Sequence, residues 1–177
     1  MPKVTAHSSV SVCSLSALPA HAKAIGASHL MTILREHDVV PTPDGIAPDR
    51  HLRIGVNDIT EPREGFIHPE PNHLAEIITF ARAWDGTAPL LIHCWAGISR
   101  STAAAFVSLC TRNPDTEEAR IAATLRAASP TATPNRLMVE LADGLLNRQG
   151  RMVRAIEAIG PGASAMEGQP FLLPSRF

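Results

Sequence analysis

The sequence predicts an α/β fold, with a central, mainly parallel sheet of about four to five strands flanked by helices on both faces. Short apolar runs typical of buried strands recur along the chain and alternate with stretches of helical periodicity. The length of 177 residues suits a single domain, which we place at residues 1–160. The Gly-, Pro- and Ser-containing stretch at 161–177 predicts a loose C-terminal tail.

The first half of the chain predicts three strands. Residues 10–15 and 51–56 alternate between apolar and polar side chains with a period of two, as half-buried strands do. Residues 28–34 form an apolar run that suits a central strand. The Ala-rich segment 17–24 predicts a helix, and the proline-rich segment 36–50 predicts a surface loop.

The middle of the chain predicts one further strand between two helices. The short apolar run at 89–92 indicates a buried parallel strand. The segment 101–110 is rich in Ala, Val and Leu and predicts a buried helix. The helix before the strand presents one apolar face, made of Leu74, Ile77, Ile78, Ala81 and Trp84.

Two more helices are predicted after residue 110. A capping box at residues 115–118 opens the first, which Pro130 ends. Thr133 and Pro134 open the second, whose apolar stripe we assign to Leu137, Leu141 and Leu145. Basic residues then recur at a spacing of three, and we interpret them as a solvated face: Arg148, Arg151 and Arg154.

The composition argues against several classes of function. A net charge of −1 gives no overall field for nucleic acid or a membrane surface, so neither is expected as a partner. We find no apolar run that could span a bilayer and no signal-peptide pattern. Three cysteines do not indicate a disulfide framework, which favours a reducing cytoplasm, and Cys13 suits a small core residue.

Residues 93–101, His-Cys-Trp-Ala-Gly-Ile-Ser-Arg-Ser, lie on the turn between a predicted strand and a predicted helix. The backbone N–H groups of such a turn point at one place, and the helix dipole adds partial positive charge there. Gly97 allows a tight turn, and the guanidinium of Arg100 can bind two oxygens of a phosphate. Thiols beside a helix N-terminus and a cation ionise readily, so Cys94 is a candidate phosphoryl-transfer nucleophile.

The pattern His-Cys-x5-Arg-Ser resembles the signature of the cysteine-dependent protein tyrosine phosphatase superfamily. Its surroundings are most similar to a small dual-specificity-like, bacterial-type member. The resemblance covers about residues 10–145, and residues 51–110 most firmly. It implies a protein tyrosine phosphatase-like fold and a reaction that passes through a phosphocysteine.

The resemblance also implies a general acid after the strand at 51–56. Small dual-specificity phosphatases carry an Asp there, and Asp58 matches that place. Glu61 or Glu64 could take the role if the loop is shifted, and Asp58 could instead only tighten a turn. If this strand lies parallel to the one before Cys94, both residues emerge at the same edge of the sheet.

The same resemblance assigns the other motif residues. The phosphate would bind residues 95–100 of the loop: Trp95, Ala96, Gly97, Ile98, Ser99 and Arg100. Ser101 would hydrogen-bond the leaving thiolate, or it is an ordinary first-turn residue. His93 would orient the loop and tune Cys94, or it is a plain buried histidine. No metal or cofactor is needed, because the loop dipoles and Arg100 supply positive charge.

We therefore predict hydrolysis of phosphomonoesters, with phosphotyrosine in a protein or peptide as the first substrate and dual specificity as an extension. The loop carries no lysine, which argues against a polyphosphorylated lipid without excluding it. An RNA 5′-phosphatase would favour a basic face, and an inactive phosphate-binding module is the remaining alternative. Two points stay open: whether Trp95 walls the pocket, and whether Cys13 or Cys110 can form a protective disulfide with Cys94.

Overall fold

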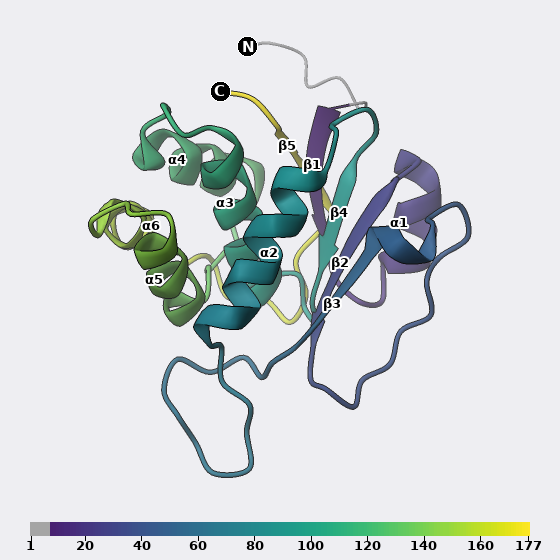
Figure 1. Ribbon diagram of the computed structural model, residues 1–177, viewed down its shortest axis with the longest axis horizontal. Coiled ribbons are helices and arrows are strands. Elements are labelled where there is room, and N and C mark those ends of the chain that lie inside the picture. Colours follow the sequence, from purple (N-terminus) through teal and green to yellow (C-terminus); the bar gives the residue numbers. More distant parts are fainter. Residues whose placement is uncertain (1–7) are drawn as a thin grey trace.

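A computed structural model describes residues 8–177 as a five-stranded sheet with helices on both faces (Figure 1). The strands are β1 Ser9–Cys13, β2 His29–Leu34, β3 His51–Gly55, β4 Leu90–His93 and β5 Phe171–Pro174. Their order in the sheet is β3-β2-β4-β1-β5. The first four pair in parallel, and β5 pairs antiparallel to β1. The predicted fold class is confirmed.

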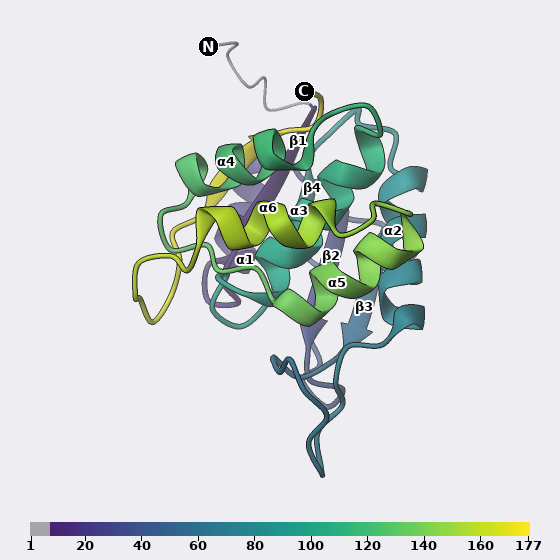
Figure 2. The same ribbon diagram turned by 90° about the vertical axis from the view of Figure 1, so that its left-hand side faces the viewer.

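The helices divide unequally between the two faces of the sheet. In chain order they are α1 Leu18–Ile25, α2 Pro71–Ala83, α3 Arg100–Arg112, α4 Glu118–Ala128, α5 Arg136–Leu145 and α6 Arg151–Ile159. Helix α1 covers one face, and α2 to α6 gather on the other (Figures 1 and 2). Each face has its own apolar cluster, a small one around Leu18 and Leu91 and a large one that contains Val12 and Phe106. Within the described residues, none of the helices is long and apolar enough to cross a bilayer.

The C-terminal segment differs from the loose tail predicted for residues 161–177. Residues Phe171–Pro174 form β5, and Leu173 is fully buried. Arg126 holds the start of the segment in place by donating hydrogen bonds to the carbonyl oxygens of Ile159, Gly160 and Pro161. It also donates one to the carbonyl oxygen of Ala132. A short edge strand gives a weak local signal, because its stability depends on a partner strand that lies far away in the sequence.

The predicted apolar stripe of α5 is wrong. Leu141 packs against the border of the core, Leu137 is half-buried, and Leu145 is 42% exposed. The buried side consists of Met138, Val139, Ala142 and Asp143. Both stripes fit the helical period, so hydrophobic spacing alone does not choose between them.

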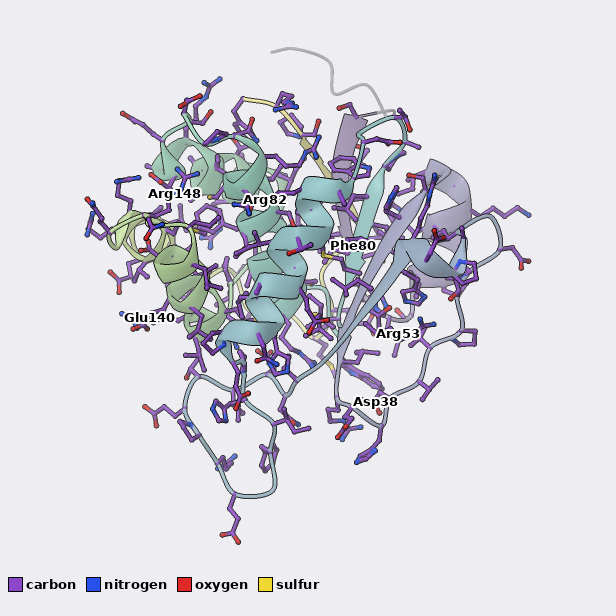
Figure 3. All side chains as sticks on the ribbon, viewed as in Figure 1. Asp38, Arg53, Phe80, Arg82, Glu140 and Arg148 are labelled. Carbon is purple, nitrogen blue, oxygen red and sulfur yellow. The ribbon has the colours of Figure 1, made fainter. Side chains whose placement is uncertain are left out.

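Arg148 is buried, not solvated as predicted, and lies between α4 and α6 (Figure 3). Its Nη1 is 2.9 Å from Oε1 of Glu118, whose side chain is 5% exposed. The same guanidinium donates hydrogen bonds to the carbonyl oxygens of Cys110 and Pro114. Glu118 therefore forms an ion pair. The predicted capping box at residues 115–118 is absent, because no side-chain hydrogen bond caps α4 at its N-cap residue Glu117.

Candidate active site

The motif loop lies at the carboxyl end of β4, the central strand of the sheet. It ends where α3 begins at Arg100, with Ser99 at the N-cap position. The loops that follow β2 and β3 leave the sheet at the same edge, since these strands are parallel to β4 (Figure 1). Ligands of open parallel sheets bind at this edge.

The carbonyl oxygens of the loop are bonded to segments outside it. They accept backbone hydrogen bonds as follows: Trp95 from Leu15, Ala96 from Gly168, Ile98 from Thr133, and Ser99 from Asn135. By contrast, none of the backbone N–H groups of residues 95–99 donates a hydrogen bond to any residue in the described part of the chain. A peptide loop whose carbonyl groups bond outward and whose N–H groups lack acceptors has the donors that an anion requires.

Gly97 is required by both conformation and space. Its φ of +72° lies in the left-handed region, which residues with a Cβ rarely adopt. A Cβ at this position would lie 2.8 Å from the carbonyl carbon of Cys13 and 2.9 Å from the backbone nitrogen of Ser14. The loop therefore packs directly on the end of β1.

The guanidinium of Arg100 is held against the loop. The residue is 7% exposed, and its Nη1 donates a hydrogen bond of 2.8 Å to the carbonyl oxygen of Val56, just after β3. Its buried Nε has no hydrogen-bond partner among the described residues. The same holds for Nε of Arg112 and Arg126, but of the three only Arg100 belongs to the motif loop, where a guanidinium can bind an oxyanion.

Cys94 opens the motif loop and is 2% exposed. Its Sγ is 3.1 Å from Oγ of the fully buried Ser101, as the predicted role of that serine requires. His93, also fully buried, has its Nδ1 3.2 Å from the carbonyl oxygen of Cys94. The residues predicted to act on sulfur are therefore in contact with it or with its backbone.

Asp58 reaches the loop from the end of β3. Its Oδ1 accepts hydrogen bonds from Oγ of Ser99 at 2.8 Å and from Nδ2 of Asn135 at 2.9 Å. The alternative acids, Glu61 and Glu64, are exposed. Neither side chain forms a hydrogen bond or an ion pair with the motif loop. Of the three carboxyl groups, Asp58 is the one that contacts the motif loop.

Asn135 is a site residue that the sequence analysis missed. It is 4% exposed, and its Nδ2 also donates a hydrogen bond to the carbonyl oxygen of Ile59. Its Oδ1 accepts a hydrogen bond from the backbone N–H of Met138, which caps α5. An Asn just before an apolar periodic stretch is a helix N-cap pattern, which could predict the cap but not the contact with Asp58.

The mouth of the site is a cavity of about 330 Å³. It is lined by Arg35, Asp38, Asn57, Asp58, Trp95 and Arg100. Trp95 is 57% exposed, so its indole forms a wall of the mouth and does not pack into the core. Arg35 forms a two-bond ion pair with Asp38 at 2.8 and 3.0 Å, which lowers the pKa of that carboxyl group.

The other two cysteines are free and buried on opposite sides of the sheet, Cys13 in the cluster under α1 and Cys110 in the larger core. Burial raises the pKa of Cys13 to about 12, and it raises that of Cys110 as well. The interpretation of Cys13 as a core residue is confirmed.

No family model and no curated protein matches the sequence. Solved structures do match. DUSP15 aligns with a TM-score of 0.60 and 21% identity, covering 89% of this chain and 95% of its own. Human DUSP28 aligns with a TM-score of 0.60 and 18% identity, covering 79% and 89%. PTPMT1 in complex with PI(5)P aligns with a TM-score of 0.61 and 14% identity, covering 87% and 96%.

The chain has the fold of the dual-specificity phosphatases. The predicted protein tyrosine phosphatase-like architecture is thereby confirmed. Within the dual-specificity phosphatase fold, the loop after β4 carries the cysteine and the arginine of the motif. The expectation of a bacterial-type member stays a prediction.

Proposed function

We propose that the protein hydrolyses phosphomonoesters through a phosphocysteine formed on Cys94. The loop at residues 94–100 carries this proposal. The N–H groups of residues 95–99 and the buried Nε of Arg100 lack acceptors among the described residues, and the loop begins at the thiol of Cys94. Such an arrangement stabilises the charge of a phosphoryl group in the transition state without a metal. The fold shared with the dual-specificity phosphatases supports it.

In the first step, the thiolate of Cys94 attacks phosphorus in line with the leaving oxygen. The S–P bond forms and the P–O bond to the leaving group breaks. Asp58, in its acid form, gives its proton to the leaving oxygen, which otherwise departs as a costly alkoxide or phenoxide. Its hydrogen bonds from Ser99 and Asn135 fix its carboxyl group beside the loop.

In the second step, water attacks the phosphocysteine. The carboxylate of Asp58 takes a proton from the water, a P–O bond forms, and the P–S bond breaks. The hydroxyl of Ser101, 3.1 Å from the sulfur, donates a hydrogen bond to the departing thiolate. Inorganic phosphate then leaves and the free enzyme is restored.

Phosphotyrosine in a protein or peptide is the proposed substrate, with phosphoserine and phosphothreonine as secondary substrates. Cys94 is almost fully buried, which favours a long phosphorylated side chain that can reach it. The exposed indole of Trp95 at the mouth offers an aromatic surface for a phenyl ring.

A phosphoinositide is the main competing substrate, since the structure of PTPMT1 holds PI(5)P. A polyphosphorylated head group needs free cations around the loop. The loop has no lysine, and Arg35 at the mouth is already paired with Asp38. We therefore rank polyphosphorylated lipids below the phosphopeptide. PI(5)P carries a single phosphomonoester on its ring, so the substrate panel decides its rank.

The test is a panel of substrates with purified protein. It contains one peptide sequence phosphorylated on Tyr, Ser or Thr, vesicles with PI(5)P, and 5′-phosphorylated RNA, each assayed for release of phosphate. We expect kcat/KM for the phosphotyrosine peptide to exceed the others by about tenfold or more, equivalent to about 1.4 kcal/mol. A preference for the lipid or the RNA would replace the proposed substrate.

The matched variants are Cys94→Ser and Cys110→Ala. Cys94→Ser should abolish turnover and keep phosphopeptide binding, whereas Cys110→Ala, a buried cysteine outside the site, should keep both. Binding without any turnover by the wild-type protein would identify a phosphate-binding module.

A further inference from the structure

A line of buried polar side chains runs across three neighbouring strands, away from the phosphate loop. Nε2 of His93 on β4 is 2.8 Å from Oγ1 of Thr32 on β2, and that oxygen is 2.7 Å from Nε2 of His51 on β3. The parallel register places Thr32 directly beside His93. All three residues are less than 10% exposed, with values of 0%, 3% and 7% for His93, Thr32 and His51.

The carbonyl oxygen of Cys94, at one end of the line, determines which atom donates in each hydrogen bond. A carbonyl oxygen only accepts, so Nδ1 of His93 carries the hydrogen that faces the Cys94 carbonyl at 3.2 Å. Burial lowers the pKa of His93 to about 4, so the ring is neutral at pH 7 and its Nε2 is an acceptor. The hydroxyl of Thr32 must therefore donate to His93, and its oxygen accepts from Nε2–H of His51.

The outer end of the line obeys the same logic. Burial also lowers the pKa of His51 to about 4, so this ring is neutral with its hydrogen on Nε2. Its Nδ1 then accepts from the hydroxyl of Thr42 at 2.8 Å. The oxygen of Thr42 accepts a hydrogen bond from Nη2 of Arg53. Arg53 projects from β3 toward the loop between β2 and β3, which carries Thr42 (Figure 3). Every donor in the line has one acceptor, and the line ends on a cation that cannot accept.

We propose that Thr32 and His51 are positioning residues that hold His93 as its Nδ1–H tautomer and thereby fix the carbonyl of Cys94 and the phosphate loop. With the other tautomer, a lone pair on Nδ1 of His93 would face the lone pairs of that carbonyl oxygen, and the loop would lose its bond at the nucleophile. The inference rests on the proposed function of the loop and adds to it two residues outside the motif.

A purely structural role of the same line is the competing explanation, because buried polar networks also stabilise a sheet. The two roles differ in what they change. A structural role changes the free energy of unfolding alone. A positioning role changes the tautomer of His93 and the affinity of the loop for an oxyanion in protein that remains folded.

The test compares two near-isosteric pairs of variants. Thr32→Val removes the hydroxyl and keeps the shape, whereas Thr32→Ser keeps the hydroxyl. His51→Gln can place an N–H donor near the position of Nε2, whereas His51→Asn is too short to reach Thr32. Ser11→Ala is the control, because the buried Ser11 forms a serine–histidine pair with the half-buried His21, at 2.7 Å, that makes no bond to the loop.

Three measurements are made on each variant: histidine side-chain ¹⁵N NMR, the Kd of orthovanadate, and kcat and KM with para-nitrophenyl phosphate. We expect the wild type to show His93 protonated on Nδ1 and His51 on Nε2. Thr32→Val and His51→Asn should lose the single tautomer of His93, weaken vanadate binding and lower kcat, each by about tenfold. Thr32→Ser, His51→Gln and Ser11→Ala should stay within about threefold of the wild type.

Either of two results overturns the inference: His93 protonated on Nε2 in the wild type, or folded Thr32→Val with wild-type vanadate affinity and kcat. If Thr32→Val does not fold, the inference is tested by the tautomers of the wild type and by the variants Thr32→Ser, His51→Gln and His51→Asn. A wild type without turnover would refute the proposed function alone, since the tautomers and vanadate affinity are measured without it.

Discussion

The role proposed for Asp58 depends on the neighbours of its side chain. Its carboxyl group is exposed on one side, yet two hydrogen bonds from Ser99 and Asn135 fix it beside the phosphate loop. A general acid needs this kind of fixed position more than it needs burial.

Replacing Asp58 with Asn should lower the rate in proportion to the difficulty of the leaving group. For an alkyl phosphate, which needs the proton, we expect a loss of about 10²–10⁴ in kcat/KM. For an activated aryl phosphate, the loss should be about tenfold or less. Asn135→Ala should give a weaker version of the same pattern, and an equal loss for both leaving groups would remove Asp58 from the role of acid.

The residues of the site divide into those with a local signal and those without one. Cys94, Gly97 and Arg100 could be predicted because they share one short motif between a strand and a helix. Asn135 contributes from a different helix, and Thr32 from a different strand. Their contacts depend on tertiary structure, so no pattern of neighbouring residues reveals that they reach the loop.

Among the features of the helices, the ion pair of Arg148 and Glu118 was the hardest to predict from the sequence. Regular spacing of arginines is typical of a solvated face, and Arg154 fits that description. Arg148 instead lies in the turn before α6 and is enclosed by the end of α3 and the start of α4. Sequence spacing indicates periodicity but not whether a neighbouring helix covers the residue.

Arg148→Met should destabilise the protein by about 2–4 kcal/mol, because it leaves the carboxylate of Glu118 buried with only Arg151 as a partner. Arg154→Met is the matched control and should cost less than about 0.5 kcal/mol. Urea denaturation measures both. Adding Glu118→Gln to Arg148→Met should recover part of the loss, and additive losses would contradict a coupled pair.

For the whole molecule, the α/β class and the first four strands follow from local periodicity, and the structure confirms them. Strand β5 does not follow, because it is an edge strand that pairs with β1 from the far end of the chain. It also brings residues 160–170 near the motif loop, where the N–H of Gly168 donates to the carbonyl oxygen of Ala96. The phosphate loop is thus supported by segments from both ends of the domain.

The whole molecule should lose stability as the pH falls from 6.5 toward 4. The pKa values of His51 and His93 are about 4 in the folded protein, lowered by burial from 6.5. The unfolded chain therefore binds more protons in this window, so the free energy of unfolding rises with pH and is at its full value above pH 6.5. The expected loss is about 2–3 kcal/mol for each histidine across the window.

Urea denaturation at a series of pH values measures this slope. Burial also lowers the pKa of His21 and His29, so His51→Gln removes one of several titrating groups, and its slope between pH 4.5 and 6.5 should be smaller than that of the wild type. A free energy of unfolding that does not change between these pH values would show that the two histidines are not held neutral by the fold.

The most direct test of the account is to trap the phosphorylated intermediate. Protein carrying Ser101→Ala, in which breakdown should be slow, is mixed with a ³²P-labelled phosphotyrosine peptide, quenched within milliseconds and mapped by mass spectrometry. The account predicts close to one phosphoryl group per active site, attached to the sulfur of Cys94, with a burst of dephosphorylated peptide of the same size. Turnover of the peptide with no label on Cys94, or with the label on another residue, would contradict it.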